Sequence, residues 1–397
     1  MYSIRARKRA VTMVEGIMRA FEAPVISLFR RAQPSSMSQA AHQLRAAMLG
    51  MGVSYAGVVV GYALLRPLLG GRNGWIELAD DLEPWAYGPA PVVGLLGAAL
   101  GSGGLIAAGV AMMAAFGLRW GHRYLRRSLP TTESRAACDL TVMTYNALAW
   151  QREGRDLEAS IVSADPDIVG LQEIGLRGAE HLVEAFAARL PYHCVTAAAN
   201  SPGVAVLSRY PLRDPVRFRA SPRSHWWQRM TIETPVGPIT YLNIHTRIPH
   251  IRKTHRMIGR LRIPLEFHAE RRRMEIGKLA SMLDEIDGPV IVGGDFNMTE
   301  RSSDHRMMSG RLRDAYKSVG AGLGHSFPRA GSFPHALPAP WPILRLDYVW
   351  HSQHFGPSWA YRGDAGHSDH HPIVVGLRWV TPAVHSGASV PLAASVV

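Results

Sequence analysis

Cysteine is nearly absent from this chain of 397 residues, which contains only Cys138 and Cys194. Two cysteines are too few for a disulfide framework, and they lack the spacing of a metal site, so we expect two buried thiols. Acidic residues are also scarce, with 31 Asp and Glu against 44 Lys and Arg, and the formal net charge is +13. Such a basic chain favours an anionic partner, either a nucleic acid or a lipid surface.

The basic excess is concentrated in the first third of the chain. Residues 1–127 contain 14 Lys and Arg against 6 Asp and Glu, whereas the remaining residues contain 30 against 25. The larger part of the chain therefore does not have the composition of a strongly basic nucleic-acid binder.

Two long uncharged stretches lie in this first third. Residues 46–65 carry no charge, and neither do residues 84–118. About 20 apolar residues are needed to cross a membrane as a helix, and neither stretch has a polar face. We therefore predict two transmembrane helices, with a pair of buried helices in a soluble domain as the alternative.

The charges that flank these stretches predict their orientation. Eight Lys and Arg precede the first stretch, and four Arg follow the second within ten residues. The loop between them carries two arginines and four acidic residues: Glu77, Asp80, Asp81 and Glu83. The positive-inside rule then places both termini and the large domain in the cytoplasm, with a short external loop. If the second stretch were two short spans, the large domain would lie outside.

Strand and helix patterns alternate after a polar linker. They predict a hairpin of 230–234 with 238–245, a helix at 270–287 and a buried strand at 289–292. This mixture indicates an α/β fold, a four-layer sandwich of two mixed β-sheets flanked by helices and preceded by a transmembrane helical hairpin. The predicted organisation is a basic cytoplasmic segment at 1–45, a membrane anchor at 46–118, a linker at 119–137, a catalytic domain at 138–380 and a disordered tail at 381–397.

Polar residues with carboxylate, amide or imidazole side chains end the predicted strands. In chain order they are Asn146, Glu173, His245, Asp295, Asn297, Asp347, Asp369 and His370. Each of them alone is more often a turn former or a helix cap. Strand ends at one edge of a sheet converge on a common crevice, and carboxylate, amide and imidazole groups suit a metal-assisted phosphoryl site. An Asp directly before a His, as at 369–370, can orient the imidazole and favour its protonated form.

This set resembles the endonuclease/exonuclease/phosphatase superfamily, which includes DNase I-like nucleases, neutral sphingomyelinases and inositol-polyphosphate 5-phosphatases. The most specific pieces are Leu-Gln-Glu at 171–173, Gly-Asp-Phe-Asn at 294–297 and Ser-Asp-His at 368–370, and the turn at 207–211 is a further similar element. The resemblance covers about residues 139–379 and implies a metal-dependent hydrolase of phosphoester bonds.

The resemblance also implies residue roles. Glu173 and Asn146 are expected to bind Mg²⁺, with Mn²⁺ as the alternative ion. His370, oriented by Asp369, is expected to be the general base, and Asp295 to align the attacking water. Asn297 and His245 are expected to hold phosphate oxygens, and Asp347 to orient His245 or to contribute to the metal site.

A basic segment follows His245, with arginines and lysine interleaved with apolar residues as far as Arg273. One interpretation is a solvated charged helix; the other is a lip beside the active site that contacts anionic headgroups or a polynucleotide. We consider three arginines as candidate substrate contacts: Arg209, Arg247 and Arg252.

Three functions follow from these observations. The first is a membrane-anchored, Mg²⁺-dependent phosphoesterase that hydrolyses phosphate mono- or diesters of a lipid type, because tethering concentrates the enzyme at a membrane. The second is a membrane-tethered endo- or exonuclease. The third is a non-catalytic membrane scaffold that binds phosphate. The expected partners are the phosphoester substrate and the membrane, and no obligate protein partner is implied.

Overall fold

The computed structural model describes residues 37–66, 74–126, 129–149, 155–198, 201–258, 261–331 and 340–380. The predicted tail at 381–397 and most of the basic segment at 1–45 lie outside these residues. The described chain forms two compact units. We call residues 37–66 and 87–115 the helical unit, and residues 74–86 and 116–380 the sheet unit.

The helical unit contains three apolar helices. They are α2 (Met37–Leu65), α4 (Ala90–Ala99) and α5 (Gly103–Phe116). A Cβ atom added to Gly109 of α5 would lie 2.6 Å from the backbone nitrogen of Gly94, so glycine allows α4 and α5 to pack backbone to backbone. The segments His42–Leu65 and Gly103–Tyr124 are long and apolar enough to cross a membrane, by length and composition alone.

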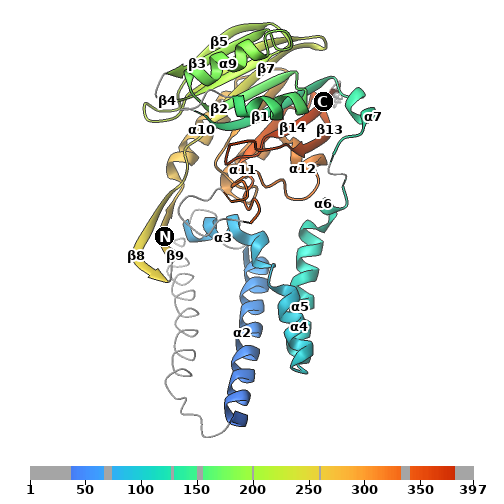
Figure 1. Cartoon of the computed structure of the whole chain (residues 1–397), viewed down its shortest axis with the longest axis vertical. Helices are drawn as coiled ribbons and strands as arrows, with labels where there is room; N and C mark the ends of the chain where they lie inside the picture. Colours follow the sequence, from blue (N-terminus) through green and yellow to red (C-terminus); the bar gives the residue numbers. More distant parts are fainter. Residues whose placement is uncertain are drawn as a thin grey trace, which may run out of the picture. The chain divides into compact units, whose positions relative to one another are not determined.

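The first sheet of the sheet unit has six strands and mixed pairing (Figure 1). The strand β1 pairs in parallel with β2 and antiparallel with β14. In spatial order the strands are β13 (Phe355–Arg362), β14 (Ile373–Trp379), β1 (Leu140–Ala149), β2 (Ile168–Ile174), β4 (Ser201–Ser208) and β3 (Tyr192–Ala198).

The second sheet also has six strands, and here β10 pairs in parallel with β7 and antiparallel with β12. Every residue of β10 is buried, as expected for a central strand covered on both faces. The spatial order is β11 (Arg313–Asp314), β12 (Asp347–His351), β10 (Val290–Asp295), β7 (Gly237–His245), β6 (Trp227–Thr234) and β5 (Leu212–Phe218).

Three apolar cores hold the layers together. The middle core joins the two sheets, for example Val142 and Ile168 with Ile232 and Tyr241. The outer face of the first sheet is covered by α8 (Arg155–Ala164) and α9 (Leu176–Ala185). The outer face of the second sheet is covered by α10 (Glu270–Asp284) and α11 (Ser303–Ser309). The predicted sandwich of two mixed sheets between helices is confirmed.

Shorter helices complete the sheet unit. They are α3 (Gly74–Ala86), the π-helical turn η2 (Gly117–Gly121), α6 (His122–Tyr124), α7 (Thr132–Ala136) and α12 (Ala315–Val319). The acidic segment that we expected in an external loop is therefore the helix α3, and it belongs to the sheet unit.

Several local predictions hold and others do not. The hairpin of β6 and β7 and the helix α10 lie where the sequence places them. The basic segment after His245 is not a helix, because β8 (His250–Ile258) and β9 (Leu261–His268) form an antiparallel hairpin. Both cysteines are free and half-buried rather than buried.

Candidate active site

The strand pairing brings the predicted site residues to one edge of the sandwich. Asn146 of β1 lies beside Gln172 of β2 in a parallel pair, so Glu173 follows at the same edge. In the second sheet Asp295 is paired with His245 on one side and with Asp347 on the other. The loop before β14 returns to this edge because Ile373 pairs with Thr144.

Two residues of this edge have left-handed backbone conformations. Glu173 has a φ of 52° and Asn297 a φ of 46°. Glu173 also lies where the register of β2 against β4 shifts, as at a β-bulge. Such conformations cost free energy and redirect a side chain away from the regular alternation of a strand, so they are often kept at functional sites.

His370 is held by Asp347. Its Nδ1 lies 2.8 Å from Asp347 Oδ2, and both side chains are buried. Its Nε2 lies 3.9 Å from Asp295 Oδ2, and the ring of Phe327 packs against it with centroids 4.7 Å apart. The hydrogen bond to the ring of His370 comes from Asp347 and not from Asp369, and Asp347 thus contacts His370 where the sequence predicted a role toward His245 or the metal site.

The carboxylates around His370 determine its charge. Burial alone would lower the pKa of His370, but Asp347, Asp295 and Asp369 outweigh it and raise the pKa to about 10. Burial raises the pKa of Asp295, and the His370 imidazolium opposes that rise. Without a bound cation, His370 is therefore protonated at neutral pH.

Asn146 connects the carboxylate of Glu173 in the first sheet with that of Asp295 in the second sheet. Its Nδ2 donates to Glu173 Oε1 at 3.1 Å and to Asp295 Oδ2 at 3.0 Å, while its Oδ1 accepts from Leu148 N. Burial raises the pKa of Glu173, and the Asn146 hydrogen bond partly offsets this. The three residues form one hydrogen-bonded group of hard oxygen and amide atoms.

His245 lies on the other side of Asp295 and is neutral. Its Nε2 is 3.6 Å from Glu173 Oε1 and 3.8 Å from Asp295 Oδ2. Burial lowers its pKa well below the usual range, and His225 and His370 lower it further. The ring of His225 is stacked on it, with centroids 3.9 Å apart and an interplanar angle of 13°. Sequence reasoning missed His225, because it lies 20 residues from His245 and ends no strand.

Asn297 and Ser368 brace the strand ends. Asn297 Nδ2 donates to the carbonyl of Thr246, and its backbone N–H donates to Asp295 Oδ1. Ser368 Oγ donates to the carbonyl of Asn146 at 2.6 Å and accepts from the backbone N–H of His370. Ser368 therefore links the loop of His370 to β1, a role that the Ser-Asp-His motif did not reveal.

The three candidate substrate arginines have different outcomes. Arg209 lies away from the other site residues, because Ser208 pairs with Ile168 at the start of β2 and places Arg209 at the opposite edge, paired with Asp165 and Asp167. Arg247 follows His245 closely and lines a surface pocket of about 270 Å³ together with two other arginines. The side chain of Arg252 lies outside the described residues.

The buried acidic residues can hold a divalent cation. Asp295, Asp347 and His370 each bring one potential ligand atom within 4.8 Å of the others. Among the described residues Asp347 Oδ1 is buried and has no hydrogen-bond partner, so a nearby cation would satisfy it. The carboxylates of Glu173 and Asp295 fit a hard ion, and Asn146 fits once its amide oxygen is turned toward them.

Residues 143–370 match the model of the Endonuclease/Exonuclease/phosphatase family. The chain belongs to this family, whose members are metal-dependent hydrolases of phosphoester bonds. The predicted family is thereby confirmed. A search of curated proteins found no match.

Solved structures with the same fold include three representative matches. An endonuclease/exonuclease/phosphatase from Beutenbergia cavernae is 21% identical, with 62% of this chain and 72% of that chain covered and a TM-score of 0.46. The mannosyl-6-phosphatase Bt3783 of Bacteroides thetaiotaomicron is 17% identical, with 60% and 100% covered and a TM-score of 0.45. The human Nocturnin catalytic domain is 20% identical, with 65% and 98% covered and a TM-score of 0.43.

Proposed function

We propose that the protein is a membrane-anchored, Mg²⁺-dependent phosphoesterase that hydrolyses phosphate mono- or diesters of a lipid type. The observation that carries this proposal is the pair of His370 and Asp347, which directs His370 Nε2 toward Asp295 at 3.9 Å. A histidine oriented by a buried carboxylate, next to a second carboxylate, is the arrangement that a general base for an attacking water requires.

The residues around this pair have complementary roles in the proposal. His370 accepts the proton of the attacking water, and Asp295 aligns that water. His245 is neutral and buried, so its ring N–H can donate to a phosphate oxygen without carrying a charge itself. Asn297 retains a second amide hydrogen for the substrate, because only one is given to Thr246.

Glu173 and Asn146 would hold the Mg²⁺ ion, with Asp295 and Asp347 beside it. A bound divalent cation polarises the phosphoryl group and offsets the negative charge of the surrounding carboxylates. The positive charge of the cation also opposes the protonation of His370, so the pKa of His370 is expected to fall when the cation binds. The choice between Mg²⁺ and Mn²⁺ follows from a metal titration.

The substrate class is inferred from the apolar helices. An enzyme tethered by α2 meets membrane-borne phosphoesters at a high local concentration. A nuclease is the second candidate, because Arg247 lies near the site in a pocket that Arg223 and Arg271 also line. A non-catalytic scaffold is the third, and the completeness of the set of site residues, most of them buried, argues against it.

The test uses the full chain in detergent micelles, because α3 belongs to the sheet unit and a fragment that starts after α5 would lack it. Hydrolysis is measured with Mg²⁺ on phosphoinositide vesicles, sphingomyelin vesicles, plasmid DNA and single-stranded DNA. His370→Ala serves as the blank and Arg209→Ala as the matched control. Turnover of lipid alone supports the proposal, turnover of DNA alone supports the nuclease, and no turnover of any phosphoester supports the scaffold.

A further inference from the structure

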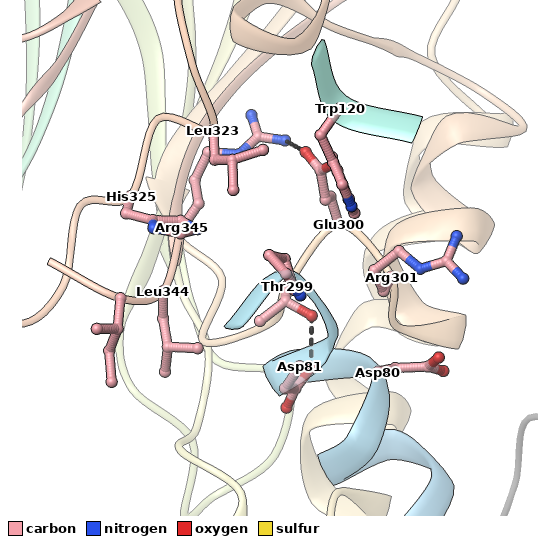
Figure 2. A pocket seen from close by; sticks show the side chains of 12 residues that line it. Asp80, Asp81, Trp120, Thr299, Glu300, Arg301, Leu323, His325, Leu344 and Arg345 are labelled. Atoms are coloured by element: carbon pink, nitrogen blue, oxygen red, sulfur yellow. Dashed lines mark hydrogen bonds and ion pairs between the residues drawn. The ribbon is translucent and has the colours of Figure 1, made fainter. Parts of the chain in front are cut away.

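The acidic helix α3 is docked on the sheet unit through buried charges. Glu77 and Glu83 are 2% and 3% exposed. Glu77 is paired with Arg273 of α10, and Glu83 Oε2 lies 2.6 Å from Arg301 Nε. Asp81 Oδ1 accepts a hydrogen bond from Thr299 Oγ1 at 2.5 Å, as Figure 2 shows. Removing one member of such a pair leaves an uncompensated buried charge, so the docked position is strongly preferred.

Trp85 extends the docking at the end of α3. Its Nε1 donates to the carbonyl of Ile343 at 2.7 Å, and its ring lies 5.3 Å from that of His325. Ile343 and His325 line the same small pocket as Asp81 (Figure 2). Polar and aromatic contacts therefore hold α3 to the sheet unit as far as Trp85, close to Tyr87, where the apolar residues 87–116 begin.

The chain after α5 is tied to the same place. Arg119 Nε lies 2.9 Å from Glu83 Oε1, so the segment that follows the apolar stretch is bound to α3, which precedes it. Arg123 is buried and donates to Glu300 at 2.8 Å. The segments directly before and after residues 87–115 thus both belong to the sheet unit.

Between these two ends the chain forms an uncharged hairpin. No Asp, Glu, Lys or Arg occurs from Tyr87 to Leu118. The contacts of Gly94 with Gly109, and of Gly97 with Ile106, run antiparallel. Large apolar side chains face outward, and Leu95 is 72% exposed. Such a surface fits lipid better than water.

We propose that residues 87–116 enter the membrane and leave it on the same side, so that α3 and the sheet unit lie together, across the membrane from the residues that precede α2. In the helical unit, Arg45 of α2, which directly precedes the uncharged residues 46–65, donates to the carbonyl of Leu100 at the hairpin turn. The hairpin therefore reaches the far end of the α2 span. The chain therefore crosses the membrane once in α2, and the hairpin returns to the side that it entered from. The sheet unit then lies on the side opposite to the residues before α2.

The basic residues then place the sheet unit outside the cytoplasm. Eight Lys and Arg precede the uncharged residues 46–65 of α2, and the positive-inside rule retains them in the cytoplasm. The four arginines that follow the second uncharged stretch gave the opposite assignment in the sequence, but two of them, Arg119 and Arg123, are paired with glutamates of the sheet unit. This placement holds whatever reaction the site catalyses. An enzyme placed in this way meets an extracytoplasmic substrate, such as the headgroup of an outer-leaflet lipid.

Cysteine accessibility in the full chain tests this arrangement. Three exposed positions are used in a background that carries Cys138→Ser and Cys194→Ser: Gln43→Cys before the uncharged residues 46–65 of α2, Leu82→Cys on α3 and Ser281→Cys on α10. Intact and permeabilised bacterial cells that express each variant are treated with a membrane-impermeant maleimide. A C-terminal alkaline phosphatase fusion, which is active only outside the cytoplasm, gives a second readout.

We expect Leu82→Cys and Ser281→Cys to be labelled in intact cells, Gln43→Cys to be labelled only after permeabilisation, and the fusion to be active. Labelling of Leu82→Cys without Ser281→Cys would place α3 and the sheet unit on opposite sides and overturn the proposal. Labelling of all three only after permeabilisation, with an inactive fusion, would overturn it as well.

A charge exchange tests the docking itself. Glu77→Arg should lower the unfolding temperature by several degrees, and the double variant Glu77→Arg with Arg273→Glu should recover at least half of that loss. A double variant as unstable as the sum of the two single variants would show that the ion pair does not hold α3, and would remove the basis of the proposal.

Discussion

The two histidines of the site lie on opposite sides of Asp295 and differ in charge. His370 and His245 are both buried, and their Nε2 atoms are 3.9 Å and 3.8 Å from Asp295 Oδ2. Asp347 binds His370 directly at 2.8 Å, whereas the nearest carboxylate to His245 is that of Glu173 at 3.6 Å, and the ring of His225 is stacked on His245. The pKa of His370 is raised to about 10, and that of His245 is lowered well below its usual range.

This difference shows that burial by itself does not determine the charge of a histidine. Burial lowers the pKa of both residues, and only the carboxylate contact reverses its effect at His370. Pairs of groups whose surroundings separate their pKa values in this way are typical of acid–base sites. The region of His370 suits proton transfer, and the region of His245 suits neutral hydrogen bonding to a phosphate oxygen.

The largest expected effect is that of His370→Ala, which removes the base. We expect kcat/KM to fall by about 10³-fold or more with the unfolding temperature retained within a few degrees. Steady-state hydrolysis of the best substrate measures this. His371→Ala is the matched control, since the neighbouring ring contacts the carbonyl of Gly363 instead. Equal losses in the two variants would contradict the assignment.

The second prediction separates the two aspartates near His370. Asp347→Asn should lower kcat by about 10²-fold or more, because the ring loses the carboxylate that orients it. Asp369→Asn should change kcat by less than about tenfold, because Asp369 makes no hydrogen bond to the ring among the described contacts. The ratio of the two kcat values is the measurement, and a ratio near one would restore the sequence-based role of Asp369.

The third prediction concerns the stability of the protein without metal. Folding raises the pKa of His370 from 6.5 to about 10, so its stabilising contribution is complete below pH 6.5 and is lost as the pH rises through 10. One pKa unit corresponds to about 1.4 kcal/mol, so the free energy of unfolding should fall by several kcal/mol at most. Unfolding in chelator at pH 7 and pH 10 measures this fall, which Asp347→Asn should reduce and Arg209→Ala should leave unchanged.

A smaller effect is expected at the other histidine. His225→Ala removes the ring stacked on His245 and should lower kcat/KM by about tenfold, whereas His225→Phe keeps a ring in place and should retain most of the activity. Parallel kinetics of the two variants measure the difference. Equal loss in both would mean that the imidazole of His225, and not the stacking, contributes to turnover.

The smallest effect is expected for Arg209→Ala. Arg209 lies at the opposite edge of the first sheet, and its guanidinium pairs with Asp165 and Asp167 at a partly exposed surface. We expect kcat/KM within about twofold of wild type and a loss of at most about 1 kcal/mol of stability. A large rise in KM would return Arg209 to the substrate-binding residues.

Much of the sheet unit is predictable because the pattern of apolar residues is local. The strands of Val290–Asp295 and Ile373–Trp379 are buried apolar runs, and each ends or begins beside a site residue. The strands β8 and β9 were missed, since their arginines and apolar residues alternate too irregularly to separate a strand from a helix. His225 was missed because only the packing of the β6 region brings it to His245.

The sequence by itself indicated which predicted strands end on a polar site residue, because an apolar run and the polar residue that follows it are local features. Only the tertiary structure decided which carboxylate serves which histidine. Asp369 precedes His370 in the chain, but the hydrogen bond to the ring of His370 comes from Asp347, which approaches from the other sheet. Tertiary packing also decided the place of α3, because its acidic residues are satisfied by arginines distant in sequence.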